Sequence, residues 1–397
     1  MSEHNLSEVT EVLQKLLQIK SPYFEEEDIM HYVQNWFEKN NIPCTRHEYH
    51  EQKVTGFKGI NVICELDSGL PGPAIHINGH LDTVQLCSGW TKDPYGGVIE
   101  GDRIYGVGAV DMKGGCAANM VAIKRFKESG VPFRGKIVAS FVSVEEGPFG
   151  LGSNALIEDG KLGKIDLTIV TEPTGGLSGP EHPLICLGAK GGYGGTIELF
   201  GKSAHAARPE GGISAAVDAA KVVCELEKVR GKNDPFLGEG KLCVIKIDSD
   251  GGACSVPDYA KIVIFRHIVP GETQDTIRAE IEEAIQKANI RSAHKFSFRD
   301  APSPESEGFM PYRTDENEPY VLQMEETIAE VTGKKAQHIY FSSIGDFNYF
   351  GTRVNAPCIV FGTSGEGGHS SDEYTTISST EKLVDVLVAF LEKALKP

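Results

Sequence analysis

The sequence lacks the hallmarks of several large classes of protein. It contains no run of about 18 apolar residues, the length that a membrane-spanning helix needs. Its N-terminal stretch MSEHNLSEVTEVLQKLLQIK has neither the basic start nor the uninterrupted apolar core of a secretion signal. The nine cysteines are scattered and never form a Cys-x-x-Cys pair, which argues against a disulfide framework and a zinc ribbon. These absences predict a cytoplasmic protein that does not bind a membrane.

Basic residues are also in deficit. Lys and Arg number 39 against 56 Asp and Glu, which gives a formal net charge of −17. Such a charge disfavours binding to nucleic acid, so we expect no nucleic-acid partner. It leaves many carboxylates available as ligands for hard metal ions. The 397 residues exceed what one ordinary hydrophobic core accommodates, and they predict about two or three domains.

Short apolar runs alternate with stretches of helical periodicity over much of the chain. Residues 7–19 and 26–40 carry apolar side chains at helical spacing. The runs that indicate buried strands are NVICEL, AIHINGH, KIVASFV, DLTIV and, much later, APCIVFG. This alternation predicts an α/β domain with a mixed, largely parallel sheet.

A unit of different character begins near residue 188. Its elements follow the order β-α-β-β-α-β and end on the strand HKFSFRD, which is the order of a ferredoxin-like α+β domain. We therefore predict a catalytic domain made of residues 1–187 and 302–397, interrupted by an insertion of residues 188–301. A helix over 318–332 returns the chain to the first domain.

Ionisable residues follow the predicted strands of the first domain. In an open parallel sheet the carboxyl ends of the strands lie along one edge, and ligands bind there. The residues that follow these strands, or lie in glycine-rich loops nearby, are His80, Asp82, Asp111, Glu145, Glu146, Glu172 and His369. They are therefore expected to meet at one edge of the sheet.

This set of side chains predicts a metal centre. Two histidines, one aspartate and two glutamates form a mixed nitrogen and oxygen set that suits zinc, or cobalt and manganese, better than calcium. If one carboxylate bridges, such a set holds two metal ions about 3.5–4 Å apart. The adjacent pair then divides its work, with Glu146 as a ligand and Glu145 as the general base.

Motifs along nearly the whole chain make the sequence resemble a known family. They are GHLDTV (79–84), GVGAVDMKGG (106–115), VEEG (144–147), TEPT (171–174), GKSAHAARPEGG (201–212), FRHIVPGET (265–273) and GGHSSDEY (367–374). The sequence resembles the co-catalytic zinc amidohydrolases that include acetylornithine deacetylase, succinyl-diaminopimelate desuccinylase, aminoacylase and glutamate carboxypeptidase.

The resemblance implies a role for each residue of the metal centre. One ion would be held by His80, Asp111 and Glu172, and the other by Asp111, Glu146 and His369, with Asp111 as the bridge. Asp82 would stand behind His80 and fix its tautomer. Glu145 would be the general base.

The resemblance also implies roles in the insertion, which would be a dimerisation or lid domain. His205 would reach across the interface of a homodimer and stabilise the oxyanion in the partner's site. Arg266 would grip the substrate carboxylate. Two positions depart from the family pattern: Val107 replaces an arginine, and Cys254 stands where a substrate-binding asparagine is expected.

The function predicted from these residues is hydrolysis of an amide bond in a small N-acyl amino acid, an intermediate of amino-acid metabolism. The alternative within the family is a carboxypeptidase or dipeptidase, although Met112 is more typical of the deacylase and glutamate-carboxypeptidase branches. A serine hydrolase is disfavoured because GTSGEG has Glu366 where a nucleophile elbow needs glycine. A non-catalytic binding protein is disfavoured because Glu145 and every proposed ligand are present.

Overall fold

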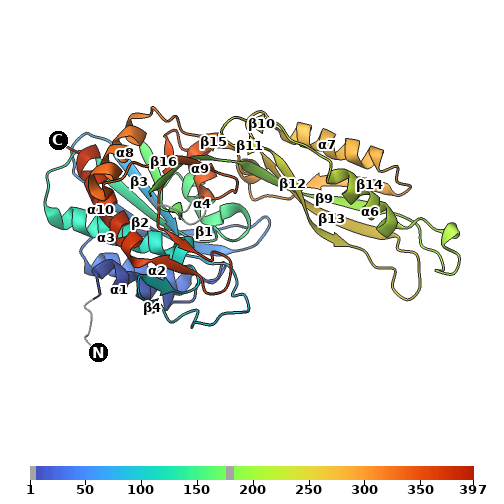
Figure 1. The fold of residues 1–397 in the computed structure, drawn as a ribbon, viewed down its shortest axis with the longest axis horizontal. Helices are drawn as coiled ribbons and strands as arrows, with labels where there is room; N and C mark the ends of the chain where they lie inside the picture. The colour runs from blue at the N-terminus through green and yellow to red at the C-terminus, as the bar shows by residue number, and fades with distance from the viewer. Residues whose placement is uncertain (1–5, 176–182) are drawn as a thin grey trace. The chain divides into compact units, whose positions relative to one another are not determined.

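The computed structural model describes residues 6–175 and 183–397, and these form two compact units (Figure 1). The first comprises the described residues up to Gly188 together with Arg313–Phe341 and Gly345–Pro397. The second comprises Ala189–Tyr312 and Ser342–Ile344. In the described part of the chain, no helix has the length and apolar character needed to cross a bilayer.

The first unit is built on a nine-stranded mixed sheet. Its order is β1-β2-β6-β3-β7-β17-β8-β15, and β16 pairs with β8. The central pairs β6–β3, β3–β7 and β7–β17 are parallel, whereas β1–β2, β2–β6 and β17–β8 are antiparallel. The strands are β1 Cys44–His50, β2 Lys58–Asp67, β3 Ala74–His80, β6 Lys136–Val142, β7 Leu167–Val170, β8 Leu184–Ala189, β15 Tyr312–Arg313, β16 Gln337–Phe341 and β17 Cys358–Val360. The prediction of a mixed, largely parallel sheet is confirmed.

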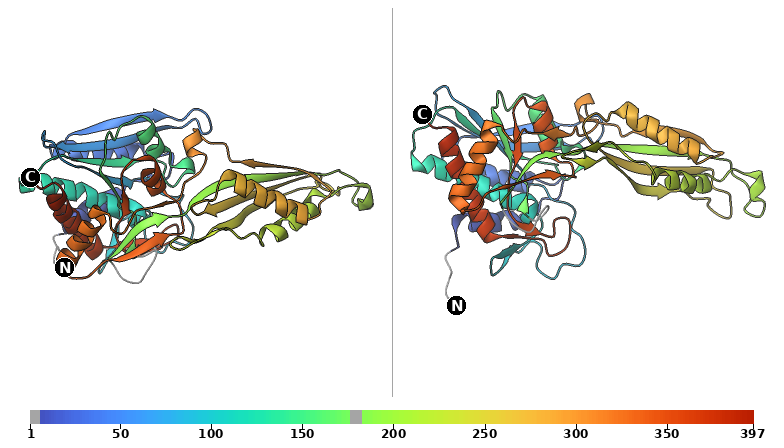
Figure 2. Two further views of the ribbon diagram at one scale, coloured as in Figure 1. Left: turned by 90° about the horizontal axis from the view of Figure 1, so that it is seen from above. Right: turned by 45° about the horizontal axis from the view of Figure 1, so that its top comes forward.

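Helices cover both faces of this sheet. One face packs on α1 Glu8–Leu17, α2 Glu27–Lys39, α3 Gly114–Ser129, α8 Pro319–Thr332 and α10 Ile377–Ala394, and Figure 2 shows α10 in red beside α3 in teal. The other face packs on α4 Leu151–Glu158 and α9 Asp346–Arg353. Strand β3 shows the alternation, because Ile75 and Ile77 join the core under the first group while the His76 ring contacts Phe350 of α9.

A small sheet of order β18-β19-β5-β4 joins two distant segments. Its strands are β4 Val98–Glu100, β5 Arg103–Tyr105, β18 Gly365–Glu366 and β19 Tyr374–Thr376. Pairing of β19 with β5 brings the loop that carries His369 beside the turn that carries Asp111, and the Gly106 amide donates to the Glu373 carbonyl at 3.0 Å.

The second unit is an antiparallel sheet of order β12-β13-β9-β14 with α6 and α7 packed on one face. Its elements are β9 Gly191–Phe200, α6 Ala215–Leu226, β12 Lys241–Asp248, β13 Tyr259–Ile268, α7 Gln274–Lys287 and β14 Ala293–Phe298, with a short hairpin of β10 Asn233–Asp234 and β11 Gly238–Glu239. This chain order and sheet order are those of a ferredoxin-like fold.

The second unit continues past residue 301, where the insertion was expected to end. Gly192 and Phe309 exchange two backbone hydrogen bonds, of 2.8 and 3.0 Å, so the segment after β14 stays paired with the start of β9. A side chain at Gly191 would place its Cβ 2.2 Å from the Phe309 carbonyl oxygen, so this close pairing requires glycine.

Candidate active site

Three neighbouring parallel strands deliver acidic and histidine side chains to one edge of the first unit's sheet. His80 is the last residue of β3 and lies opposite Val142, the last residue of β6. Glu145 and Glu146 follow β6, and Glu172 follows β7. Because the strands run parallel, these side chains emerge together.

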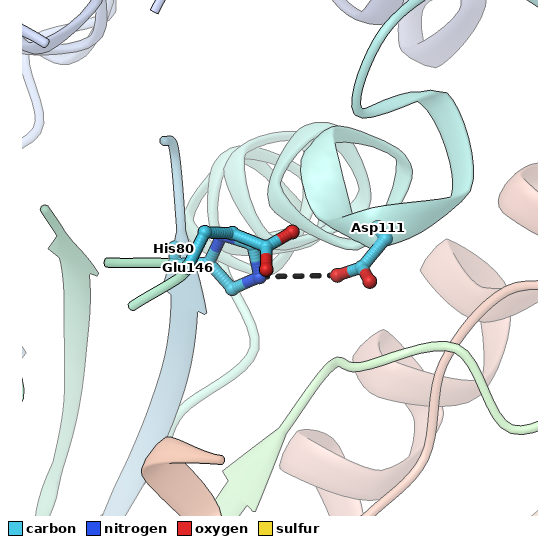
Figure 3. A group of neighbouring side chains, drawn as sticks. All are labelled: His80, Asp111 and Glu146. Carbon is cyan, nitrogen blue, oxygen red and sulfur yellow. Dashed lines mark hydrogen bonds and ion pairs between the residues drawn. The ribbon is translucent and has the colours of Figure 1, made fainter. Parts of the chain in front are cut away.

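Asp111 lies between two histidines. Its Oδ1 is 3.2 Å from His80 Nε2, and its Oδ2 is 3.3 Å from His369 Nε2. Figure 3 shows the Asp111 carboxylate facing the His80 ring, with Glu146 beside them. The two oxygens of a single carboxylate are thus directed at two different imidazoles.

Each histidine also has a glutamate of its own. Glu172 Oε1 lies 3.3 Å from His80 Nε2, and Glu146 Oε2 lies 2.9 Å from His369 Nε2. Ligand atoms of His80, Asp111 and Glu146 all lie within 4.8 Å of one another, as do those of His80, Glu145 and Glu172. The five residues predicted as ligands therefore occupy one place in the first unit.

Glu145 differs from Glu146 in its contacts. Its Oε1 accepts the backbone N–H of Asp346, the first residue of α9, at 3.2 Å. Its Oε2 lies 3.9 Å from His80 Nε2, farther than the carboxylates of Asp111 and Glu172. One oxygen is thus anchored by the protein while the other faces the histidine.

Asp82 contacts His80 mainly through its backbone carbonyl, whereas the resemblance implied a contact through its carboxylate. The His80 Nδ1–H donates to the backbone carbonyl of Asp82 at 3.0 Å, while the Asp82 carboxylate is 3.6 Å away. The carbonyl therefore fixes the orientation of the ring and leaves Nε2 facing Asp111 and Glu172. The carboxylate accepts the backbone N–H groups of Glu145 and Glu146, at 3.0 and 2.9 Å.

The site concentrates negative charge away from solvent. Burial raises the pKa of Glu146 to about 7, and the neighbouring Asp111 carboxylate contributes to this rise. Burial also raises the pKa of Glu145 well above its ordinary value, although His80 opposes this. Hydrogen bonds to Asp111 and Glu146 raise the pKa of His369 to about 11. Carboxylates crowded in this way, together with two imidazoles, form a donor set that can hold divalent cations.

Three acidic residues that sequence reasoning missed support this site. Glu373 accepts the backbone N–H groups of Gly108, Val110 and Asp111 at 2.8 to 3.0 Å, and so holds the turn that carries Asp111. Asp346 is buried, and its N–H donates to Glu145. Glu26 is also buried and accepts the N–H of Val144, the residue that precedes Glu145. Asp346 lies five residues after the strand β16, which sequence reasoning did not predict.

The two predicted residues of the second unit have contrasting surroundings. His205 is exposed in a loop, and its Nδ1 accepts the Ala207 N–H at 3.1 Å, which leaves Nε2 as the protonated nitrogen of a neutral ring. Arg266 is only 1% exposed, and its guanidinium pairs with Glu272 at 2.6 Å and with Glu280 at 3.1 Å. The Arg266 guanidinium is thus paired within the second unit in this structure, and its contact with a substrate carboxylate stays a prediction.

The α/β fold and the cluster of histidines and carboxylates at its sheet edge define a metal-dependent hydrolase. The model of peptidase family M20/M25/M40 matches residues 76–393, and the chain belongs to this family. The family that the motifs indicated is thereby confirmed, as is the assignment to hydrolytic enzymes.

Individual relatives agree with this assignment. A succinyl-diaminopimelate desuccinylase of Sulfurovum sp. is 25% identical over 383 residues, which cover 95% of this chain and 96% of that protein. A tripeptidase of Staphylococcus aureus has a TM-score of 0.79 at 18% identity, with 98% of each chain covered. A metallo-carboxypeptidase of Sulfolobus solfataricus has a TM-score of 0.78 at 18% identity, covering 98% of this chain and 99% of that one. At such identities the two structures show the shared fold.

Proposed function

We propose that this protein is a deacylase that hydrolyses the amide bond of a small N-acyl amino acid, in the manner of its desuccinylase relatives. The observation that carries the proposal is the Asp111 carboxylate between His80 and His369, with Glu145 beside this group and anchored at only one oxygen. A carboxypeptidase or dipeptidase of the same family is the alternative, because the same groups serve any amide.

The donor set fits two divalent cations, which we propose to be zinc, with cobalt or manganese as substitutes. His80, Asp111 and Glu172 would hold one, and Asp111, Glu146 and His369 the other. Bound there, the ions would polarise the scissile carbonyl and lower the pKa of a water molecule.

Glu145 is the proposed general base. With Oε1 held by the Asp346 N–H, Oε2 takes a proton from the attacking water as the new C–O bond forms. When the C–N bond breaks, the protonated Glu145 gives that proton to the leaving amine. The Asp82 carboxylate keeps Glu145 and Glu146 in register through their backbone N–H groups.

His205 is the proposed oxyanion donor. Since its Nδ1 accepts a backbone N–H, Nε2 carries the proton that an oxyanion requires. The resemblance implies that it acts in the partner's site, so we propose a homodimer whose contact is made by the inserted domain. We propose a cytoplasmic location for this dimer, and a catalytic role for residues 1–187 and 302–397.

Metal removal combined with a substrate screen tests the function. The protein is treated with a chelator, and hydrolysis of N-succinyl and N-acetyl amino acids and of dipeptides is measured before and after adding Zn²⁺, Co²⁺ or Mn²⁺. We expect no hydrolysis without metal and restored hydrolysis of an acyl amino acid with it. Preference for dipeptides would establish the alternative, and full activity in a metal-free preparation would refute the mechanism.

A further inference from the structure

The backbone N–H groups of three successive residues, Val144 to Glu146, all donate to acidic side chains. The N–H groups of Glu145 and Glu146 donate to Asp82, as described above. The N–H of Val144 donates to Glu26 Oε1 at 3.1 Å. The turn that carries the proposed base and a proposed ligand is thus held by two carboxylates from different parts of the chain.

This turn has a backbone conformation that needs support. Val144 has a φ of 57°, in the left-handed region that a β-branched residue rarely adopts. Such a conformation persists only where the surrounding structure imposes it. Val144 is fully buried, so its N–H has no water to replace a lost partner.

Glu26 is itself held firmly. It is 3% exposed, and the same Oε1 accepts the N–H of Phe24 at 2.9 Å. The segment before it pairs with the loop that follows His80, because the Tyr23 N–H donates to the Thr83 carbonyl at 3.0 Å and the Thr83 N–H donates to the Ser21 carbonyl at 2.9 Å. Glu26 therefore connects the loop after β3 to the turn after β6.

We propose that Glu26 is a positioning residue that holds the turn at Val144 and thereby the orientation of Glu145 and Glu146. The proposal rests on the proposed function in so far as Glu145 is the base. Glu26 acts on Glu145 and Glu146 through the backbone, by its hydrogen bond with the N–H of Val144.

The positioning role of Glu26 depends on a side chain long enough for its oxygen to accept the Val144 N–H, and a negative charge is not required. Burial, together with the nearby Asp82 carboxylate, raises the pKa of Glu26 to about 8, so a neutral side chain is compatible with its surroundings. Glu26→Gln keeps an oxygen at the same distance. Glu26→Asp keeps the carboxylate but withdraws it by one carbon–carbon bond, about 1.5 Å. The two variants therefore separate reach from charge.

The test compares Glu26→Gln, Glu26→Asp and Glu26→Ala with Glu25→Ala, which removes an exposed acid next to it. Each metal-loaded protein is assayed for kcat and KM on the best substrate, and for hydrogen exchange in peptides spanning residues 143–147. We expect the Asp and Ala variants to lose about 10- to 100-fold in kcat, with KM nearly unchanged and faster exchange in this turn. The Gln and Glu25 variants should stay near the wild type in both readouts.

The outcomes distinguish the alternatives. Full activity in Glu26→Asp with a large loss in Glu26→Gln would overturn the proposal in favour of a charge effect. Faster exchange with unchanged kcat would also overturn it. If Glu26→Ala does not fold, the comparison of Asp with Gln still decides. If the wild type cleaves none of the substrates, the proposed function fails, and exchange alone decides whether Glu26 holds the turn.

Discussion

Replacement of Glu145 by glutamine separates proton transfer from metal binding. The amide oxygen of the introduced glutamine can accept the Asp346 N–H that Glu145 Oε1 accepts at 3.2 Å, so the side chain should keep its place. Its NH₂ group replaces Oε2, which lies 3.9 Å from His80 Nε2, and cannot accept a proton from water. General-base catalysis contributes about 10²- to 10⁴-fold, so kcat should fall by this factor, which equals about 3–5 kcal/mol in the barrier.

Metal content and folding provide the controls for this variant. Burial already disfavours the charged form of Glu145, so a neutral amide should not lower the thermal midpoint of the metal-free protein. Glu146→Gln is the matched variant, because both oxygens of Glu146 lie within 3.0 Å of His369 Nε2. It should lose bound metal, measured by elemental analysis after gel filtration, whereas Glu145→Gln should retain the wild-type content.

Two results would refute this division of labour. Equal loss of metal in both variants would make Glu145 a ligand as much as its neighbour. A kcat within about threefold of the wild type in Glu145→Gln would exclude it as the base, because the loss would lie far below the range for general-base catalysis.

Three further predictions concern other parts of the molecule. Burial raises the pKa of Asp346 to about 7, so the protonated carboxyl stabilises the fold fully below its ordinary pKa near 4, and this stability is lost as pH rises through 7. In the metal-free protein, the free energy of unfolding of Asp346→Asn should therefore rise by about 3 kcal/mol relative to that of the wild type when the pH is raised from 5 to 7.5. A difference between the two proteins that does not change with pH would contradict this. Breaking the buried pair of Arg266 by Arg266→Ala should cost about 3–5 kcal/mol in chemical denaturation, and unchanged stability with a raised KM would instead support the predicted substrate role. Inactive His205→Ala and Glu145→Ala proteins, mixed with subunit exchange, should recover about a quarter of wild-type activity, because half the dimers are hybrids with one complete site of two; exchange without recovery would exclude action across the interface.

The strands and the acids that follow them were open to prediction because both have local signals. An apolar run such as KIVASFV marks a buried strand, and parallel strands place whatever follows them at one edge. The helices over 7–19, 26–40 and 318–332 were equally clear, since their apolar residues recur at helical spacing. The metal cluster follows from these two rules and from the residue types.

Glu26 and Glu373 were missed because their partners are backbone N–H groups far along the chain. Val144 lies 118 residues from Glu26, and Asp111 lies 262 residues from Glu373. No periodicity or residue type records such a pairing. For Arg266 a signal was present, because Glu272 belongs to the same motif FRHIVPGET, and an acid six residues after a strand arginine is a candidate partner.

The pairing of Gly192 with Phe309 makes the second unit a cassette. Residues exchanging backbone hydrogen bonds in this way have Cα atoms about 5.5 Å apart, so the two ends of the stretch Ala189–Tyr312 lie side by side. On the other side of the junction the Thr314 N–H donates to the Leu187 carbonyl at 2.7 Å, and the two connecting segments stay together there as well. A stretch whose two ends are paired in this way can be exchanged or enlarged while the strands that end at or before His80, Glu146 and Glu172 keep their pairing. Diversity in substrate and assembly can thus arise in the cassette while the metal-binding edge of the sheet stays the same.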